Sequence, residues 1–196
     1  MGVTAVFPLS PADGEALAEI VAGAVRANLV DVPVDGRVPL SRALRALGSS
    51  FVTLERAGSL RGCVGTLDGG RPLYRDACRN AVRAMADPRV PPVTRDEWPA
   101  LTVSVSVLSP PEPLVVRSLA ELCEELRPKI DGLILAVGAR QATFLPTVWR
   151  KLPDPVDFVR ALLHKGGWPD DELPDGARAL RYTADTFHDH EAHEPL

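Results

Sequence analysis

The chain has 196 residues, 45% of them hydrophobic and 24% charged, and its formal net charge is −4. These proportions are close to the average of soluble globular proteins and argue against a disordered chain. No segment approaches the roughly 20 apolar residues that span a bilayer. The first fifteen residues contain neither a basic leader nor a long apolar run. We therefore expect a cytoplasmic protein that does not contact a membrane.

The first half of the sequence predicts helices on both sides of a hairpin. Residues 10–31 have the periodicity of an amphipathic helix, and residues 39–48 predict a shorter one. Residues 51–67 form two extended runs around a turn at Gly58, which is the pattern of a hairpin. Residues 70–87 then predict another helix directly after the returning strand.

The second half mixes the same kinds of element. Residues 101–108 alternate between apolar and hydroxyl side chains, as in a strand with one buried face. Residues 118–128 and 154–166 predict helices, each of which begins with a residue that can cap its first turn, Ser118 and Asp154. Residues 130–149 predict a second hairpin, and residues 177–187 predict a closing strand. This order favours an α+β fold with a largely antiparallel sheet.

Charge is distributed unevenly along the chain. Residues 37–95 contain eleven arginines and four acidic residues, whereas residues 153–196 contain ten acidic and four basic residues. Four arginines recur at a spacing of four and form one row on a predicted helix: Arg71, Arg75, Arg79 and Arg83. Such a row is either a surface that binds anions such as phosphate or an ordinary solvated helix face.

The segment LRGCVGT, residues 60–66, places a cysteine between two glycines. On a strand, Arg61 and Cys63 share one face, where a fixed positive charge favours the thiolate over the thiol. Gly62 and Gly65 remove β-carbons beside the sulfur, so that another backbone or a flat ligand can approach closely. These features suit a nucleophilic or redox cysteine, with Cys63 and Arg61 as the candidate catalytic residues.

Residues on neighbouring strands complete this candidate site. Thr66 can present donors to an oxyanion, and Glu55 on the preceding strand is a candidate general base. The candidate binding residues are Gly62, Gly65, Thr66, Thr53, Glu55 and Ser104. The alternative interpretation is structural, because cysteines are often buried and glycines in strands often mark a bulge or a corner.

Metal sites are not favoured by the sequence. The three cysteines are an odd number and include no CxxC pair, which argues against a disulfide framework or a cysteine-only zinc site. The final segment, residues 188–196, groups His188, His190 and His193 with acidic residues that could together bind zinc or iron. Acidic terminal segments are more often mobile, so we predict a mobile tail, no metal site and no cofactor.

Four segments together resemble a known family: GSLRGCVGTL, DPRVPPVTRDEWPALTVSVSVLSPPEPL, DGLILAVGARQATFLPTVWRKLPDPVDFVRALLHKGGWP and RYTADTF. The resemblance is to the AMMECR domain, in the branch called AmmeMemoRadiSam system protein A, and it spans residues 9–187. The LRGC-x-GT segment is similar to the family signature, with Val64 where isoleucine is usual. Residues 188–196 are not part of the resemblance.

The resemblance implies a single α+β domain with a largely antiparallel, barrel-like sheet, flanking helices and a smaller lobe. It implies no established reaction. It does imply two partners, a Memo-like protein and a radical-SAM protein, and a role in RNA modification or translation has been suggested for the family. This chain has no CxxxCxxC motif, so an iron–sulfur cluster would belong to the partner.

Three functions, and the question of whether the protein is an enzyme, stay open at this point. In the first, the protein is part of a modification or redox system, and a pocket around Cys63 holds a small anionic or acyl substrate. In the second, it is an RNA- or nucleotide-binding module whose arginine row contacts phosphate, with affinity that falls steeply as salt rises. In the third, it is a non-catalytic scaffold for the two partner proteins.

Overall fold

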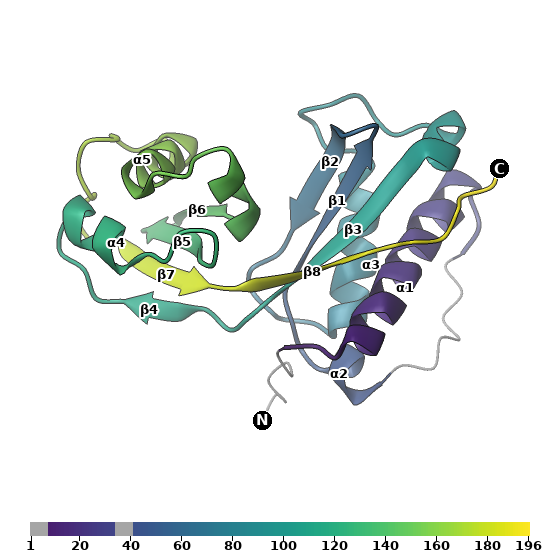
Figure 1. Cartoon of the computed structure of the whole chain (residues 1–196), viewed down its shortest axis with the longest axis horizontal. Coiled ribbons are helices and arrows are strands. Elements are labelled where there is room, and N and C mark those ends of the chain that lie inside the picture. Colours follow the sequence, from purple (N-terminus) through teal and green to yellow (C-terminus); the bar gives the residue numbers. More distant parts are fainter. Residues whose placement is uncertain (1–7, 34–40) are drawn as a thin grey trace. The chain divides into compact units, whose positions relative to one another are not determined.

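The structure is a computed structural model that describes residues 8–33 and 41–196 (Figure 1). It divides into two compact units. Unit 1 spans Met1–Leu108 and Asp185–Leu196, and unit 2 spans Ser109–Ala184. In the sequence, unit 2 is therefore an insertion between two parts of unit 1.

Unit 1 is built on an antiparallel sheet with the strand order β2-β1-β3-β8. Strands β1 and β2 form the predicted hairpin, with Ala57 and Gly58 in the left-handed conformation at the turn. In chain order the elements are α1 (Pro11–Leu29), α2 (Arg42–Arg45), β1 (Ser50–Arg56), β2 (Ser59–Gly65), α3 (Leu73–Ala84), the 3-10 helix η1 (Arg95–Ala100), β3 (Leu101–Leu108) and β8 (Ala184–His188).

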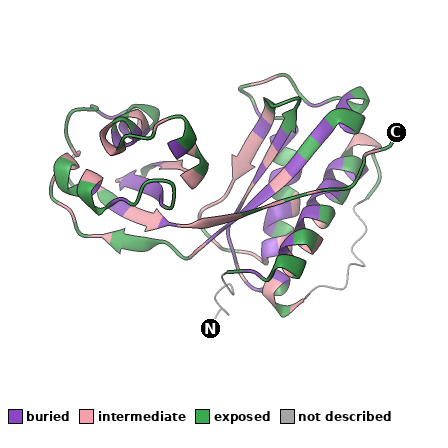
Figure 2. Cartoon of the chain, in the orientation of Figure 1, coloured by how far each residue is buried: buried purple, intermediate pink, exposed green. Residues whose placement is uncertain are grey.

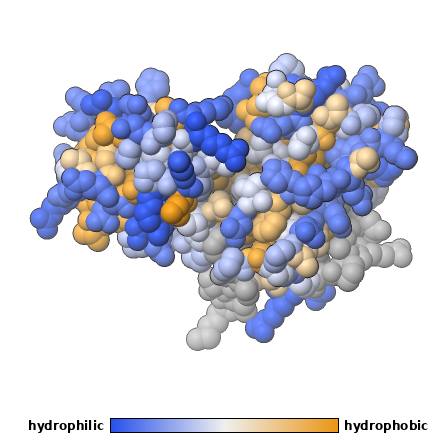
Figure 3. Space-filling model, in the orientation of Figure 1, coloured by the Kyte–Doolittle hydropathy of each residue, from blue (hydrophilic) through white to orange (hydrophobic). Residues whose placement is uncertain are grey.

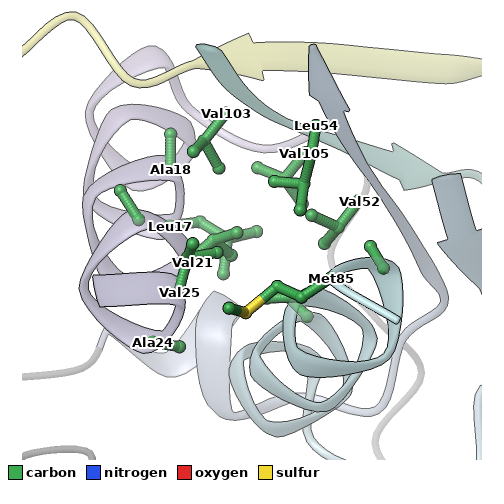
Figure 4. Packing of buried hydrophobic residues seen from close by; sticks show 14 of the residues in the cluster. Leu17, Ala18, Val21, Ala24, Val25, Val52, Leu54, Met85, Val103 and Val105 are labelled. Atoms are coloured by element: carbon green, nitrogen blue, oxygen red, sulfur yellow. The ribbon is translucent and has the colours of Figure 1, made fainter. Parts of the chain in front are cut away.

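The core of unit 1 lies between this sheet and helices α1 and α3 (Figure 4). Alternate residues of β1 and β3 point toward the helices and are fully buried: Val52, Leu54, Val103 and Val105. They meet the apolar stripe of α1, whose buried residues include Leu17, Val21 and Val25. Figure 2 shows buried and exposed residues alternating along both kinds of element.

Unit 2 contains a second antiparallel sheet, with the strand order β4-β7-β5-β6. Its elements are β4 (Glu112–Leu114), α4 (Leu119–Glu125), β5 (Gly132–Val137), β6 (Arg140–Phe144), the 3-10 helix η2 (Pro146–Arg150), α5 (Pro155–Gly166) and β7 (Arg178–Tyr182). The predicted caps of the two helices are present. Ser118 accepts a hydrogen bond from the backbone N–H of Glu121, and Asp154 accepts from those of Val156 and Asp157.

A buried carboxylate anchors the core of unit 2. Asp131 is fully buried and accepts hydrogen bonds from the backbone N–H and the guanidinium of Arg127. The carbonyl of Asp131 accepts a bond from the indole of Trp149 at 2.6 Å, and this indole stacks on Phe158 with ring centroids 3.9 Å apart. The anchor thus joins the turn before β5 to the aromatic centre of the unit.

The sequence predictions of the fold need three corrections. The barrel-like sheet is wrong, because the strands form two separate sheets and neither closes. The predicted closing strand is two strands in different sheets, β7 and β8, interrupted at Thr183, whose carbonyl accepts a bond from the Ser109 N–H. The second predicted helix is four residues long, because Leu47 leaves it to pair with Pro72. The α+β class with antiparallel sheets is confirmed.

Some sequence predictions rest partly on residues outside the described ranges. The search for a leader segment included residues 1–7, which lie outside those ranges. The predicted second helix begins at residues 39–40, and the basic segment begins at Arg37; these positions also lie outside them. Among the described helices, none combines the length and apolar character that crossing a membrane requires. On the visible surface, hydrophilic side chains predominate, with apolar ones scattered among them (Figure 3).

Candidate functional site

The LRGCVGT segment forms most of β2, the edge strand of the unit 1 sheet. Cys63 lies opposite Thr53 on β1, and Thr53 lies opposite Ser104 on β3. The three side chains therefore form a row across three strands, on the face that α1 and α3 do not cover. The Thr53 hydroxyl donates a hydrogen bond to the sulfur of Cys63 at 3.4 Å, and the Ser104 hydroxyl donates to the Thr53 carbonyl at 3.5 Å. The thiol is half-buried.

Side chains from the loop after α3 close the free edge of β2 at Cys63. The backbone N–H of Cys63 donates to the Asp87 carboxylate at 2.9 Å, and the Arg89 guanidinium donates to the Cys63 carbonyl at 2.9 Å. Arg89 and Asp87 also pair with each other, with Nε and Oδ1 2.9 Å apart. The hydrogen bond from Arg89 holds the pKa of the Asp87 carboxyl well below its ordinary value. The pair replaces a neighbouring strand and fixes the backbone that carries the thiol.

Arg61 is engaged by a carboxylate and not by the thiol. Its Nε and Nη2 donate to the two oxygens of Glu97 at 2.7 and 2.9 Å, in the bidentate geometry that guanidinium groups favour. Arg56 approaches the same carboxylate at 3.5 Å. The bonds from Arg61, together with smaller contributions from Thr94, lower the pKa of Glu97 to about 2. The positive charge expected to act on Cys63 is thus directed at η1.

Other residues of unit 1 pack closely against the two glycines of the motif, Gly62 and Gly65. A β-carbon on Gly62 would lie 1.9 Å from the carbonyl oxygen of Ala84, in the last turn of α3. A β-carbon on Gly65 would lie 2.2 Å from the ring of Phe51. Gly62 therefore permits close packing of strand on helix, and Gly65 gives room to an aromatic ring.

Thr66, expected beside the thiol, belongs to a buried network under the end of the hairpin. Its hydroxyl donates to Asp76 on α3 at 2.5 Å. The same carboxylate accepts bonds from the N–H and hydroxyl of Ser50 at 3.0 and 2.7 Å, and from Asn80 at 3.1 Å. Ser50, Asp76 and Asn80 are fully buried. The network ties β1 and β2 to α3 and gives Thr66 a structural partner.

A model of the AMMECR1 family matches residues 19–187. The chain belongs to the AMMECR1 family. It is 36% identical to a protein of Methanothermobacter thermautotrophicus over an alignment of 190 residues, and this alignment covers 93% of this chain and 97% of that protein. It is 38% identical to a protein of Thermotoga maritima over an alignment of 160 residues, and this alignment covers 78% of this chain and 84% of that protein.

A solved structure supports the same relationship for the fold. The crystal structure of the uncharacterized protein PH0010 from Pyrococcus horikoshii superposes with a TM-score of 0.87 and 28% sequence identity. The superposition covers 97% of this chain and 100% of the other. The AMMECR1 match includes every candidate site residue and ends at Phe187, so the segment after β8 is outside it.

The remaining candidates lie apart from the thiol of this AMMECR1 domain. Glu55 follows the β-bulge in the β1–β2 ladder, where it pairs with Leu60 and is exposed. The arginines of the row on and before α3 form no ion pair with any described residue, and three of them are exposed: Arg75, Arg79 and Arg83. Arg71 is half-buried and precedes the helix.

The other two cysteines of the AMMECR1 domain lie in different surroundings. Burial raises the pKa of the Cys78 thiol to about 11, and burial also raises the pKa of Cys123. In the part of the chain that the structure describes, no group of three His, Cys, Asp or Glu side chains is arranged to hold a metal ion.

Sequence reasoning missed Asp87, Arg89 and Glu97, the three residues that hold the motif in place. They lie more than twenty residues from their partners in β2, and local spacing carries no signal over such distances. The segment Asp87-Pro88-Arg89 was the one local signal, because a proline directly after the predicted helix ends it and here separates an acidic from a basic residue.

Proposed function

We propose that Cys63 is a nucleophilic thiol that accepts an acyl group, and that this AMMECR1 protein acts as one component of a modification or redox system. The observation that carries the proposal is the row of Cys63, Thr53 and Ser104 on the uncovered face of the sheet. The Thr53 hydroxyl donates a hydrogen bond to the sulfur at 3.4 Å, and this contact orients the sulfur on that face.

The preference for an acyl over an anionic substrate follows from the charges around the thiol. Arg61 belongs to β2, and Arg89 donates a hydrogen bond to its backbone at Cys63. Each of these two guanidinium groups is paired with a carboxylate. Pairing directs these two guanidinium groups at carboxylates and weakens the attraction that either would exert on an anion. A carbonyl group needs no such charge, and the hydroxyls of Thr53 and Ser104 offer polar contacts beside the sulfur.

The chemical step follows from the thiolate as nucleophile. The sulfur of Cys63 attacks the carbonyl carbon of an activated acyl compound, a C–S bond forms, and the bond to the leaving group breaks. The leaving group departs with the electron pair of that bond, and the acyl group stays on the protein as a thioester. A fixed backbone at Cys63 keeps the sulfur in one position for this attack.

The resemblance to the AmmeMemoRadiSam system protein A branch supplies the proposed partners. They are a Memo-like protein and a radical-SAM protein, which would consume or deliver the group held by Cys63. A co-purification of the three proteins tests this part, with Cys63→Ser as the variant that separates docking from chemistry. Docking that survives this substitution, with no acyl transfer in any combination of the proteins, would favour a scaffold.

Alkylation of the native protein tests the thiol directly. Iodoacetamide is added at neutral pH, and the labelling rates of Cys63, Cys78 and Cys123 are followed separately by peptide mass spectrometry. We expect Cys63 to react fastest, since burial raises the pKa of both other thiols. Protection of Cys63 until the protein unfolds would assign it a structural role.

Acyl transfer is then measured with p-nitrophenyl acetate. The expected result is release of p-nitrophenolate together with one acetyl group on the peptide that contains Cys63. Cys78→Ala and Cys123→Ala should retain this labelling, and Cys63→Ser should lose the thioester. Equal acetylation of all three cysteines would contradict a built site.

A second function is favoured by the exposed arginines of α3. Arg75, Arg79 and Arg83 lie at a spacing of four and form no ion pair with a described residue. Arg75 donates a hydrogen bond to the Tyr74 hydroxyl at 2.8 Å, so Arg79 and Arg83 are the better placed of the three to contact phosphate groups. We propose RNA or nucleotide binding as the alternative. Its test is binding of single-stranded RNA at several salt concentrations: affinity should fall steeply with salt and survive Cys63→Ala, and a salt-independent or absent interaction would remove it.

A further inference from the structure

The segment after β8 packs back onto unit 1. The backbone N–H of Asp189 donates to the carbonyl of Val103 on β3 at 3.0 Å. The ring of His193 stacks on that of Trp98 in η1, with centroids 3.7 Å apart and an angle of 8° between the planes. The side chains of His193 and Asp189 are only 7% and 3% exposed, and Leu196 packs against the core of the unit. The segment expected to be mobile thus has specific contacts.

Both nitrogens of the His193 ring face hydrogen-bond acceptors. Nδ1 lies 3.1 Å from the backbone carbonyl oxygen of Trp98, and Nε2 lies 2.6 Å from a carboxylate oxygen of Asp189. A carbonyl oxygen and an ionised carboxylate accept hydrogen bonds and cannot donate them. A neutral imidazole has one N–H, so it can satisfy one of the two contacts. Both are satisfied when the ring carries two protons and a positive charge.

The stack and the ion pair both suit that charge. A cation over the face of an indole is attracted by the ring, and a buried carboxylate attracts a cation in contact with it. Loss of one proton leaves a nitrogen lone pair facing an acceptor, in a place where water is largely excluded. The geometry thus provides an acceptor for each of the two N–H groups of a protonated ring.

Few other ionisable groups surround this ring. On η1, Arg95, Asp96 and Glu97 precede Trp98; Arg95 and Asp96 are exposed, and Glu97 is bound by Arg61. Strand β3, which receives the Asp189 hydrogen bond, has no ionisable side chain. The segment itself adds His190, Glu191 and Glu194, all of which are exposed.

We propose that residues 189–196 form a clasp that holds η1 while His193 carries both ring protons, and that opening the clasp changes the reactivity of Cys63. Glu97, the neighbour of Trp98 in η1, holds Arg61, and Arg61 is two residues from Cys63 on β2. The clasp and the thiol are thus connected through one turn of 3-10 helix and one ion pair. The regulatory half of the proposal rests on the proposed function of Cys63.

Fluorine NMR of the full chain labelled with 5-fluorotryptophan tests the clasp. Trp149 and Trp168 lie in unit 2 and serve as internal references for the Trp98 resonance. Over a range of about pH 5 to 9, where histidines titrate, the Trp98 resonance should shift along a single titration curve. A Trp98 resonance that does not move over this range would overturn the proposal.

Three substitutions identify the group that titrates. His193→Phe keeps an aromatic ring for the stack but has no ring protons, so the shift of the Trp98 resonance should disappear. Asp189→Asn provides an N–H that can donate to a neutral Nε2, so the clasp should stay closed at high pH. His190→Gln replaces an exposed histidine of the same segment and should change nothing. A titration that persists in His193→Phe would also overturn the proposal.

Alkylation of Cys63 over the same pH range separates the two halves. Thiols react faster as pH rises, so each rate in the wild type is divided by the rate in Asp189→Asn at the same pH. We expect this ratio to change with the midpoint of the Trp98 titration. A constant ratio with a titrating Trp98 would overturn the regulatory half alone. An unreactive Cys63 at every pH would remove the proposed function and leave the clasp intact.

Discussion

The two faces of the unit 1 sheet use the same strands for different purposes. On the face toward α1 and α3, Val52 and Val105 have no exposed surface and form part of the core. On the opposite face, Thr53, Cys63 and Ser104 are half-buried and bear polar or reactive groups. Because neighbouring residues of one strand belong to opposite faces, stability and chemistry are carried by adjacent positions. Substitutions one residue apart should therefore have very different effects.

The largest effect is expected on the helix-covered face at Gly62. In Gly62→Ala the new β-carbon would lie 1.9 Å from a backbone oxygen of α3, which cannot move aside as a side chain can. We expect a loss of about 3 kcal/mol in the free energy of unfolding. Gly23→Ala in α1 is the matched control, because nothing lies within 4 Å of its new β-carbon and alanine favours the helix. Urea unfolding measures both, and an equal response would contradict the packing argument.

A pair of neighbouring substitutions on β3 compares the faces directly. Val105→Ala removes two methyl groups from the core and should cost about 2 kcal/mol of unfolding free energy. Ser104→Ala, one residue away on the other face, should stay within about 0.5 kcal/mol of the wild type. Thermal and urea unfolding of the two variants would show whether the difference exists. Similar losses would mean that the polar face is also part of the core.

The ion pair between Glu97 and Arg61 should make the free energy of unfolding depend on pH in the acidic range. The pKa of Glu97 is lowered to about 2 from an ordinary value of 4.5, so its contribution is complete above about pH 4.5. It should be lost as pH falls through about 2, because the unfolded chain then takes up a proton that the folded one resists. Glu97→Gln should cost about 1–2 kcal/mol at neutral pH and flatten this acid dependence. Unfolding free energies at several pH values test this, and parallel curves for the two proteins would refute it.

The smallest effect on stability is expected at Thr53, together with a clear effect on chemistry. Thr53→Val keeps the shape of the side chain and removes the hydrogen bond to the Cys63 sulfur. Stability should change by about 0.5 kcal/mol or less. Alkylation of Cys63 at neutral pH should slow by roughly threefold to fivefold, which corresponds to a hydrogen bond of about 0.6–1 kcal/mol. Unchanged alkylation would show that the hydroxyl does not assist the thiol.

The sequence was informative where structure is local. Alternation in residues 101–108 predicted which valines are buried, and the turn residues around Gly58 predicted the β1–β2 hairpin. The motif residues 60–66 were placed on a strand, and Thr53 and Ser104 were expected near the thiol, where strand pairing places them. The order of the predicted helices and hairpins indicated the α+β class, whereas the incorrect barrel came from the family resemblance.

The sequence was uninformative where side chains meet across long separations. Arg61 was expected to act on Cys63 because the two are neighbours on one strand, yet its partner is Glu97, 36 residues away. The split of the last strand depends on Thr183 meeting Ser109, a contact between residues 74 apart. No periodicity records such pairs, because each is fixed by how separate elements come together.

The position of unit 2 in the chain has a thermodynamic consequence. It leaves unit 1 after β3 and returns to it at β8, the strand beside β3, and Ser109 and Thr183 hydrogen-bond to each other where the chain crosses. In the connectivity of the unit 1 sheet, unit 2 therefore takes the place of the loop between the neighbouring strands β3 and β8, and the two ends of this loop are held together. The entropy lost on closing a loop grows slowly with its length, and a folded insert with adjacent ends reduces it further. The strand that bears Cys63 could thus keep its geometry with a different insert, or with a short turn, in place of unit 2.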